Sequence, residues 1–409
     1  MARLFVDLSP LRESRDFRFL FGGQLVSMMG NQLTVVAIPY QVYTQTHSSL
    51  TVGLVSLIQL PLLISGSLWG GAVGDRVDRR KVMVACAIVL SLLSAGLALN
   101  AATSRPNLIL LIALAALAAG FAGFSNPARN AAIPRLVPAT QLVGAYSLNQ
   151  VGIQIATVVG PALSGVLLAT VGLSWCYWID ATSFLVVIGT SLALSPIVPL
   201  ASAVRVSTLR AVRDGFSYVR SHVAAQCVYL VDLSAMVFGM PRALFPAVAA
   251  TMYHGGPVTV GLLFAAPGVG ALLGAVTTGW VERVSRRGRA VVLAVVLWGV
   301  AIALFGLSPW TWLGLVMLAV AGWADVISAV LRNTILQSSI SDEFRSRISS
   351  IQMAVVTGGP RLGDLESGAV ASATSTEISI VSGGILCVLG AVAIVRWRPA
   401  FWREALTSS

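Results

Sequence analysis

The feature that most constrains the fold is a series of about twelve apolar runs, each near the roughly 20 residues that an α-helix needs to cross a bilayer. Hydrophobic residues make up 56% of the 409 residues and charged residues 11%, whereas soluble domains typically carry about 25% charged residues. Because no soluble chain of this length could hide so much apolar surface, its solvent must be lipid. The runs predict membrane spans at 19–44, 51–74, 82–101, 107–127, 143–170, 174–197, 222–252, 258–281, 290–308, 311–331, 348–370 and 376–395.

Basic residues lie between these runs and favour every second connection. They precede the first run and follow the second, fourth, sixth, eighth, tenth and twelfth, whereas the other connections hold only Arg105. Since an excess of Arg and Lys marks cytoplasmic loops, this asymmetry predicts a multi-pass protein of the cell (inner or plasma) membrane with both termini cytoplasmic. The net charge of +11 does not indicate a nucleic-acid partner, because the basic residues form no single polar region.

A charged turn follows the second run. It resembles the signature loop of the major facilitator superfamily (MFS) of transporters, matching its pattern at Gly71, Asp75, Arg76, Arg79 and Arg80. Asp78 departs from the family pattern, which usually has Gly there. The resemblance implies a gating loop, in which Asp75 would bind the start of the eleventh span near 348–350 and the arginines would pair across the same gap. The alternative is that the charges only fix the topology.

The charged turn recurs later in the chain, 207 residues on (282 − 75), at Glu282, Arg283, Arg286 and Arg287. A second echo links Gly160-Pro161 in the fifth span with Gly359-Pro360 in the eleventh, 199 residues apart (360 − 161). Two echoes at nearly one period predict duplicated lobes with a cavity between them. We therefore expect a six-helix lobe at 1–197, a cytoplasmic linker at 198–221 and a second six-helix lobe at 222–409.

The Gly-Pro segment of the fifth span resembles the antiporter motif that is typical of MFS exporters. Pro161 removes a backbone donor and kinks the helix, while Gly160 and Gly165 allow a neighbouring helix to approach closely. Helix packing alone would also explain these residues.

Charged residues inside the spans are the strongest functional signal, because each is costly in a bilayer and must face a partner or water. The candidates for proton coupling are Asp180, Asp232, Asp325, Asp364 and Glu366, with Arg242 and Arg361 as possible charge partners. Arg361 and Asp364 are three residues apart and can neutralise each other. A permanent structural pair, such as Asp232 or Asp325 with Arg242, is the alternative to proton coupling.

Polar and soft side chains could line a substrate cavity. The candidates are Gln24, Asn31, Gln32, Met236 and Met240, although the amides could equally join helices and the methionines could fill the core. The four cysteines and three histidines show no metal or redox spacing. We expect no metal or cofactor, and no catalytic residues that would indicate an enzyme.

Three further segments, 126–137, 179–184 and 359–364, narrow the resemblance to a bacterial MFS branch of siderophore exporters and multidrug efflux pumps. The resemblance implies an all-α membrane protein of twelve transmembrane helices in two pseudo-symmetric six-helix lobes. It also implies a monomeric, proton-driven antiporter that exports a small amphipathic solute, such as a siderophore or lipophilic drug, by alternating access. The alternatives are a proton-coupled uptake symporter for a nutrient and a non-transporting membrane sensor or scaffold.

Overall fold

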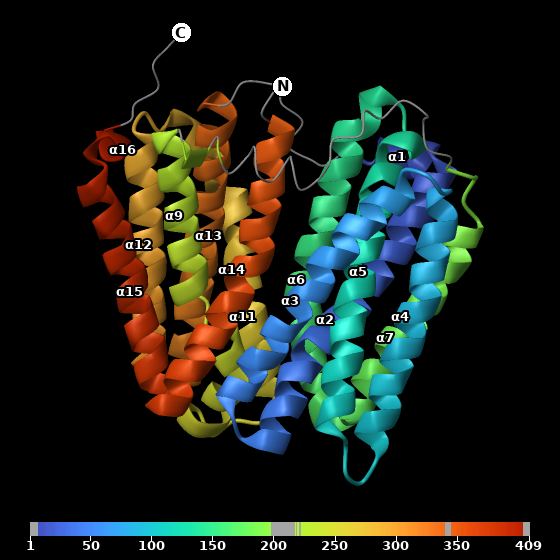
Figure 1. Cartoon of the computed structure of the whole chain (residues 1–409), viewed down its shortest axis with the longest axis horizontal. Helices are drawn as coiled ribbons and strands as arrows, with labels where there is room; N and C mark the ends of the chain where they lie inside the picture. The colour runs from blue at the N-terminus through green and yellow to red at the C-terminus, as the bar shows by residue number, and fades with distance from the viewer. Residues whose placement is uncertain (1–6, 198–216, 218, 221, 340–344, 404–409) are drawn as a thin grey trace. The chain divides into compact units, whose positions relative to one another are not determined.

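The computed structural model describes residues 7–197, 217, 219, 220, 222–339 and 345–403 (Figure 1). Every regular element among them is helical, as the composition predicts. Each predicted span corresponds to one helix or, at 222–252, to an interrupted one. The elements are α1 (Ser9–Glu13), α2 (Arg15–Thr46), α3 (Ser49–Gly74), α4 (Arg79–Ala102), α5 (Leu108–Leu136), η1 (Ala139–Gln141), α6 (Leu142–Thr170), α7 (Leu173–Leu192), α9 (Val223–Phe238), η2 (Arg242–Leu244), α10 (Phe245–Ala247), η3 (Val248–Met252), α11 (Pro257–Thr277), η4 (Thr278–Arg283), α12 (Arg287–Gly306), α13 (Thr311–Ser339), α14 (Arg345–Ala373), α15 (Thr376–Trp397) and α16 (Pro399–Arg403).

Within the described residues, ten helical segments are long and apolar enough to cross a membrane. Helices α2 and α14, with 32 and 29 residues, are not among these ten. These two helices correspond to the predicted first and eleventh spans, and they carry many of the polar candidates named above. Their polar groups therefore need partners inside the protein, because lipid offers none.

The chain divides into two compact units. The first comprises Met1–Gln45 and Ile58–Val204, and the second comprises Thr46–Leu57 and Arg205–Ser409. Thr46–Leu57 thus packs with the second unit, although it falls within the predicted first lobe. Most of the predicted linker, 198–221, lies outside the described residues.

Helices α4, α5 and α7 pack together in the first unit, where α4 contacts both of the others. One apolar core cluster joins the start of α2 to α4, α5 and α6, with Phe17, Met83 and Ala132 almost fully buried. The segment that follows α7 also belongs to this core, since Leu194 and Ile197 are buried in it. The cluster therefore anchors the chain at the point where it leaves the first unit.

In the second unit, α12 packs against α13 and α15, and α11 packs against α13. Helix α9 contacts α14 and α15. Its span is interrupted: α9 ends at Phe238, and helical turns resume at Arg242 and continue to Met252. Gly239 and Pro241 occupy the gap, which fits their roles as a flexible and a helix-breaking residue.

Candidate functional site

A buried ion pair lies inside the second unit. Asp232 on α9 is 1% exposed, and its Oδ1 lies 2.9 Å from Nη2 of Arg332 on α13, which is 3% exposed. The same nitrogen lies 3.8 Å from Oδ1 of Asp325, which is 31% exposed. Arg332 also donates from Nη1 to the hydroxyl of Ser328 at 2.9 Å. One guanidinium group therefore stands between two carboxylates.

Arg332 is the residue that the sequence reasoning missed, since it was assigned to the connection after the tenth span. Helix α13 continues to Ser339, well past the predicted end at 331, and buries the arginine. The predicted alternative partner, Arg242, is exposed at the interrupted span. The signal was present in the sequence: Asp325, Ser328 and Arg332 recur at intervals of three and four residues and so share one helix face.

Asp364 on α14 has a different environment. Its Oδ2 accepts a hydrogen bond from the hydroxyl of Ser56 at 2.6 Å, and its Oδ1 accepts one from the backbone N–H of Ala243 at 3.1 Å. Arg361 donates from Nη1 to the Ser56 carbonyl at 2.9 Å. Ser56 therefore bridges the predicted pair Arg361 and Asp364. Glu366, on the same helix, is half-buried.

Asp180 is the buried carboxylate of the first unit, at 2% exposure on α7. Its Oδ2 accepts hydrogen bonds from the hydroxyls of Thr34 on α2 at 2.9 Å and Ser94 on α4 at 2.8 Å. Among the described residues, no Lys, Arg or His nitrogen lies within 4.0 Å of it. The group is thus held by neutral donors from two neighbouring helices.

The two Gly-Pro motifs make equivalent contacts in their units. A Cβ at Gly160 of α6 would overlap the side chain of Gln32 on α2, and a Cβ at Gly359 of α14 would lie 2.9 Å from the Cβ of Met236 on α9. The motif of the fifth span thus packs on the first, and that of the eleventh on the seventh. Pro161 and Pro360 lie inside their helices, and Gly165 is buried.

The remaining cavity candidates are distributed along α2 and the interrupted span. Gln24 is buried at 7% exposure, Asn31 is exposed and Gln32 is half-buried. Met236 is buried at 7% exposure, whereas Met240 is half-buried in the gap after α9. The packing of Met236 against Gly359 agrees with the core-filling alternative.

The charged turn divides into two parts. Gly71 lies in the last turn of α3, and Asp75 and Arg76 are exposed beyond its end. Asp78 caps α4: its Oδ1 accepts hydrogen bonds from the N–H groups of Arg80 and Ile197, both at 3.0 Å. Asp78 has a negative φ of −53°, so no left-handed glycine conformation is needed there.

Arg79 and Arg80 are the first residues of α4, and Arg79 makes two further hydrogen bonds that hold the charged turn in place. Its N–H donates to the carbonyl of Ile197 at 3.2 Å, and its Nη1 donates to the carbonyl of Ala131 at 2.8 Å. These contacts fix the turn within the first unit.

The second copy of the turn can be compared only in part. Arg286 is exposed and Arg287 begins α12, while the side chains of Glu282 and Arg283 lie outside the described part. The same holds for the side chains at 348–350, the predicted partner of Asp75. The gating contact therefore stays a prediction.

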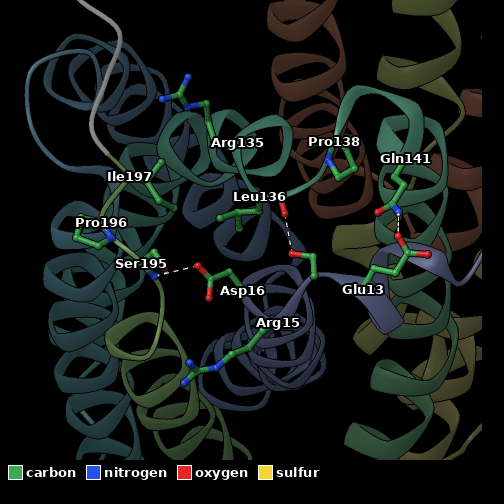
Figure 2. A pocket seen from close by; sticks show the side chains of 11 residues that line it. Glu13, Arg15, Asp16, Arg135, Leu136, Pro138, Gln141, Ser195, Pro196 and Ile197 are labelled. Atoms are coloured by element: carbon green, nitrogen blue, oxygen red, sulfur yellow. Dashed lines mark hydrogen bonds between the residues drawn. The ribbon is translucent and has the colours of Figure 1, made fainter.

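A cavity of about 570 Å³ opens in the first unit beside the start of α2 (Figure 2). Asp16 accepts a hydrogen bond there from the backbone of Ser195 at 3.1 Å, and Gln141 donates to Glu13. The predicted cavity residues are absent from its lining, which consists of Glu13, Ser14, Arg15, Asp16, Arg135, Leu136, Pro138, Gln141, Ser195, Pro196 and Ile197.

Of these sites, the Asp232–Arg332–Asp325 cluster has the chemistry best suited to respond to a proton. The described residues donate no hydrogen bond to either oxygen of Asp232, so charge alone holds the pair. Protonation of that carboxylate would remove the attraction and leave Asp325 as the remaining partner of Arg332. Together with the multi-helix fold, such intramembrane charges are typical of membrane transport proteins.

The family comparison agrees with this class. The family model described as "Transmembrane secretion effector" (MFS_3) matches residues 6–409. The chain therefore belongs to this family of the major facilitator superfamily.

Curated relatives cover almost the whole chain. The enterobactin exporter EntS of Shigella boydii serotype 18 is 30% identical over 400 residues, covering 96% of each chain. EntS of Citrobacter koseri is 30% identical over 386 residues, covering 94% of this chain and 92% of the relative.

Solved structures show the same fold at low sequence identity. A bacterial homologue of the human lysosomal transporter Spinster has a TM-score of 0.74 at 16% identity, covering 96% of this chain and 98% of that one. The nucleoside transporter NupG has a TM-score of 0.72 at 16% identity, covering 95% and 98%.

Proposed function

We propose that the protein exports a small amphipathic solute, such as a siderophore or a lipophilic drug, in exchange for protons. The observation that carries the direction of transport is the full-length similarity to enterobactin exporters. The family of secretion effectors supports the same direction. A proton-coupled uptake symporter is the alternative, and none of these relatives favours it.

Coupling to protons is assigned to the cluster of Asp232, Arg332 and Asp325. A proton arriving at Asp232 breaks its attraction to Arg332, and the arginine then pairs with Asp325, which already lies 3.8 Å away. A change of partner between α9 and one face of α13 can alter how these helices pack. Binding of a proton is thereby linked to a change in shape, which alternating access requires.

The proposed cycle takes place in the cell membrane, with both chain termini cytoplasmic and the protein acting as a monomer. The orientation rests on the alternating arginine-rich connections. In this cycle the protein moves the solute by alternating access, and the charged turn, including Asp75, acts as a gating loop on the cytoplasmic side. Its proposed partners are the solute, protons and the lipid bilayer.

Transport into everted membrane vesicles tests the proposal. An imposed gradient with an acidic interior should drive accumulation of enterobactin, or of a fluorescent lipophilic dye, in vesicles that contain the protein. An uncoupler should abolish the accumulation. Gradient-driven loss of preloaded solute would instead establish uptake symport, and transport that ignores the gradient would refute proton coupling.

The contributions of Asp232 and Asp325 to proton coupling can then be measured separately. Asp232→Asn and Asp325→Asn should each weaken the dependence of transport on the gradient, with the larger effect at the fully buried Asp232. Glu377→Gln is the matched control, because it removes an exposed carboxylate in the first turn of α15. If both cluster variants retain wild-type coupling, the assignment to this cluster is wrong.

A further inference from the structure

The seventh span contains a break whose backbone groups need partners. Helix α9 ends at Phe238, and helical turns resume only at Arg242. Pro241 cannot donate a hydrogen bond to the preceding turn, and its ring disfavours a continuous helix there. Unpaired N–H and C=O groups are costly in apolar surroundings. Side chains from other helices must therefore stabilise the break.

Two side chains supply these partners. The indole N–H of Trp298 on α12 donates to the carbonyl of Gly239 at 2.8 Å. On the other side of the break, the carboxylate of Asp364 on α14 accepts from the N–H of Ala243 at 3.1 Å. Ala243 is 3% exposed, so water does not replace this bond. Asp364 thus caps the helical turns that restart the span.

Glycine residues allow α14 to come close enough for this contact. A Cβ at Gly363 would lie 2.5 Å from the carbonyl oxygen of Met236 and 2.8 Å from that of Val237. Any larger residue would push α14 away from α9. The position of Asp364, one residue later, follows from this close approach.

Both oxygens of Asp364 are already engaged by donors. Oδ1 faces the N–H of Ala243, and Oδ2 faces the hydroxyl of Ser56 at 2.6 Å. A proton on Oδ1 would confront a backbone donor that cannot accept it. The charged groups that face this carboxylate are Arg242 at the break and Arg361 on α14.

We propose that Asp364 is a positioning residue that holds the interrupted span in its bent form and does not carry the coupling proton. The inference rests on the proposed function in one respect: it leaves proton binding to the cluster around Asp232. The two carboxylates differ in the donors that face them, because Asp364 accepts two hydrogen bonds and Asp232 accepts none from the described residues.

Substitutions of Asp364 by asparagine and by alanine separate a capping role from a proton-carrying role. Asp364→Asn keeps an acceptor for the Ala243 N–H and can place its amide N–H₂ against the Ser56 oxygen, but it cannot exchange a proton. Asp364→Ala removes the cap. Amide hydrogen exchange of the full chain in nanodiscs, followed over residues 239–247, needs no cargo and reports on the break directly.

We expect Asp364→Ala to speed exchange of the Ala243 amide by about tenfold or more, since it loses a hydrogen bond to a charged group. Asp364→Asn and Ser56→Ala should stay within about threefold of the wild type, because both keep the bond to Ala243. Glu377→Gln controls for the loss of a carboxylate elsewhere. Unchanged exchange in a folded Asp364→Ala variant would overturn the capping role.

Transport in everted vesicles provides the second readout. Asp364→Asn should retain gradient-driven transport with the pH profile of the wild type, whereas Asp232→Asn should not. If Asp364→Asn abolishes coupling while exchange at the break is unchanged, Asp364 is a proton carrier and the inference is wrong. The transport measurement on Asp364→Asn tests the positioning role even if Asp364→Ala does not fold. A wild-type protein that fails to transport would refute only the proposed function, because the exchange experiment is independent of cargo.

Discussion

Asp180 and Asp232 are both almost fully buried on membrane helices, yet the two units accommodate them in opposite ways. In the first unit, the hydroxyls of Thr34 and Ser94 donate to Asp180, and no cation among the described residues is within ion-pair distance. In the second unit, Asp232 lies 2.9 Å from Arg332. One carboxylate is held by hydrogen bonds from neutral groups, and the other by an opposite charge.

The surroundings of the two carboxylates extend this difference. Around Asp180, further serine hydroxyls join α4 to α7: Ser91 donates to the carbonyl of Ala181 at 2.9 Å, and Ser174 donates to that of Ala98 at 2.8 Å. Around Asp232, the span itself is interrupted six residues later, after Phe238. We infer that the hydroxyl-rich contact of the first unit favours a fixed packing, whereas the ion pair of the second can be switched by a single proton.

The largest effect is expected from breaking the ion pair on one side only. Arg332→Leu leaves Asp232 buried without a counter-charge, which should lower the free energy of unfolding by about 3–5 kcal/mol. Thermal unfolding of the purified protein in detergent, at neutral pH, measures this loss.

A double-mutant cycle provides the control for this prediction. Asp232→Asn combined with Arg332→Leu removes both members of the closer pair and should recover much of the lost stability, because the fully buried position 232 then carries no unpaired charge. If the double variant is as unstable as the sum of the single variants, the two side chains do not form the pair that stabilises this unit.

The second prediction concerns the first unit, where loss of charge should matter little. Asp180→Asn keeps an oxygen that can accept from Thr34 and Ser94, so unfolding should change by about 1 kcal/mol or less. Asp180→Leu removes the acceptor and should cost about 2–3 kcal/mol, since two buried hydroxyls lose their partner. Equal losses in the two variants would indicate that Asp180 depends on its charge, as Asp232 does.

The spans could be predicted from the sequence because apolar runs alternate with charged connections. The ends of the helices could not be predicted, because the bilayer sets a minimum length for a spanning helix and no maximum. Helix α5 continues past residue 127 to Leu136, and α13 continues past residue 331 to Ser339. Those extensions carry Arg129 and Arg332 into helices. The equivalent packing of the two Gly-Pro motifs could be anticipated, because the Gly-Pro segment and the charged turn both recur after nearly the same number of residues.

The partners of the buried carboxylates were harder to predict. Thr34 and Ser94 are 146 and 86 residues from Asp180, and Ala243 is 121 residues from Asp364. No local pattern encodes contacts over such separations. Gly239 and Pro241 are residues that commonly interrupt helices, but the continuous apolar run around them predicts a single span at 222–252.

The third prediction compares the two Gly-Pro motifs. Gly160→Ala should cost about 2 kcal/mol, because the new methyl overlaps Gln32 next to the backbone of α2. Gly359→Ala should cost about 1 kcal/mol, since it meets the flexible side chain of Met236. Unfolding midpoints of the two variants test the order. A reversed order would mean that the packing of α14 on α9 is the less adaptable of the two.

The smallest effect is expected at a third carboxylate, Asp78, which lies at the end of the bundle and is half-buried. Asp78→Gly restores the residue usual in the MFS signature loop but removes the acceptor for the N–H groups of Arg80 and Ile197. Glycine is itself a tolerable helix cap, so the loss should be about 1 kcal/mol or less. Amide exchange should nevertheless rise at Ile197, where the chain leaves the first unit. Asp78→Asn, which keeps the acceptor, should leave that exchange unchanged. If the glycine variant loses as much stability as Arg332→Leu, the contrast between a half-buried capping carboxylate and one paired with an arginine in the interior does not hold for this protein.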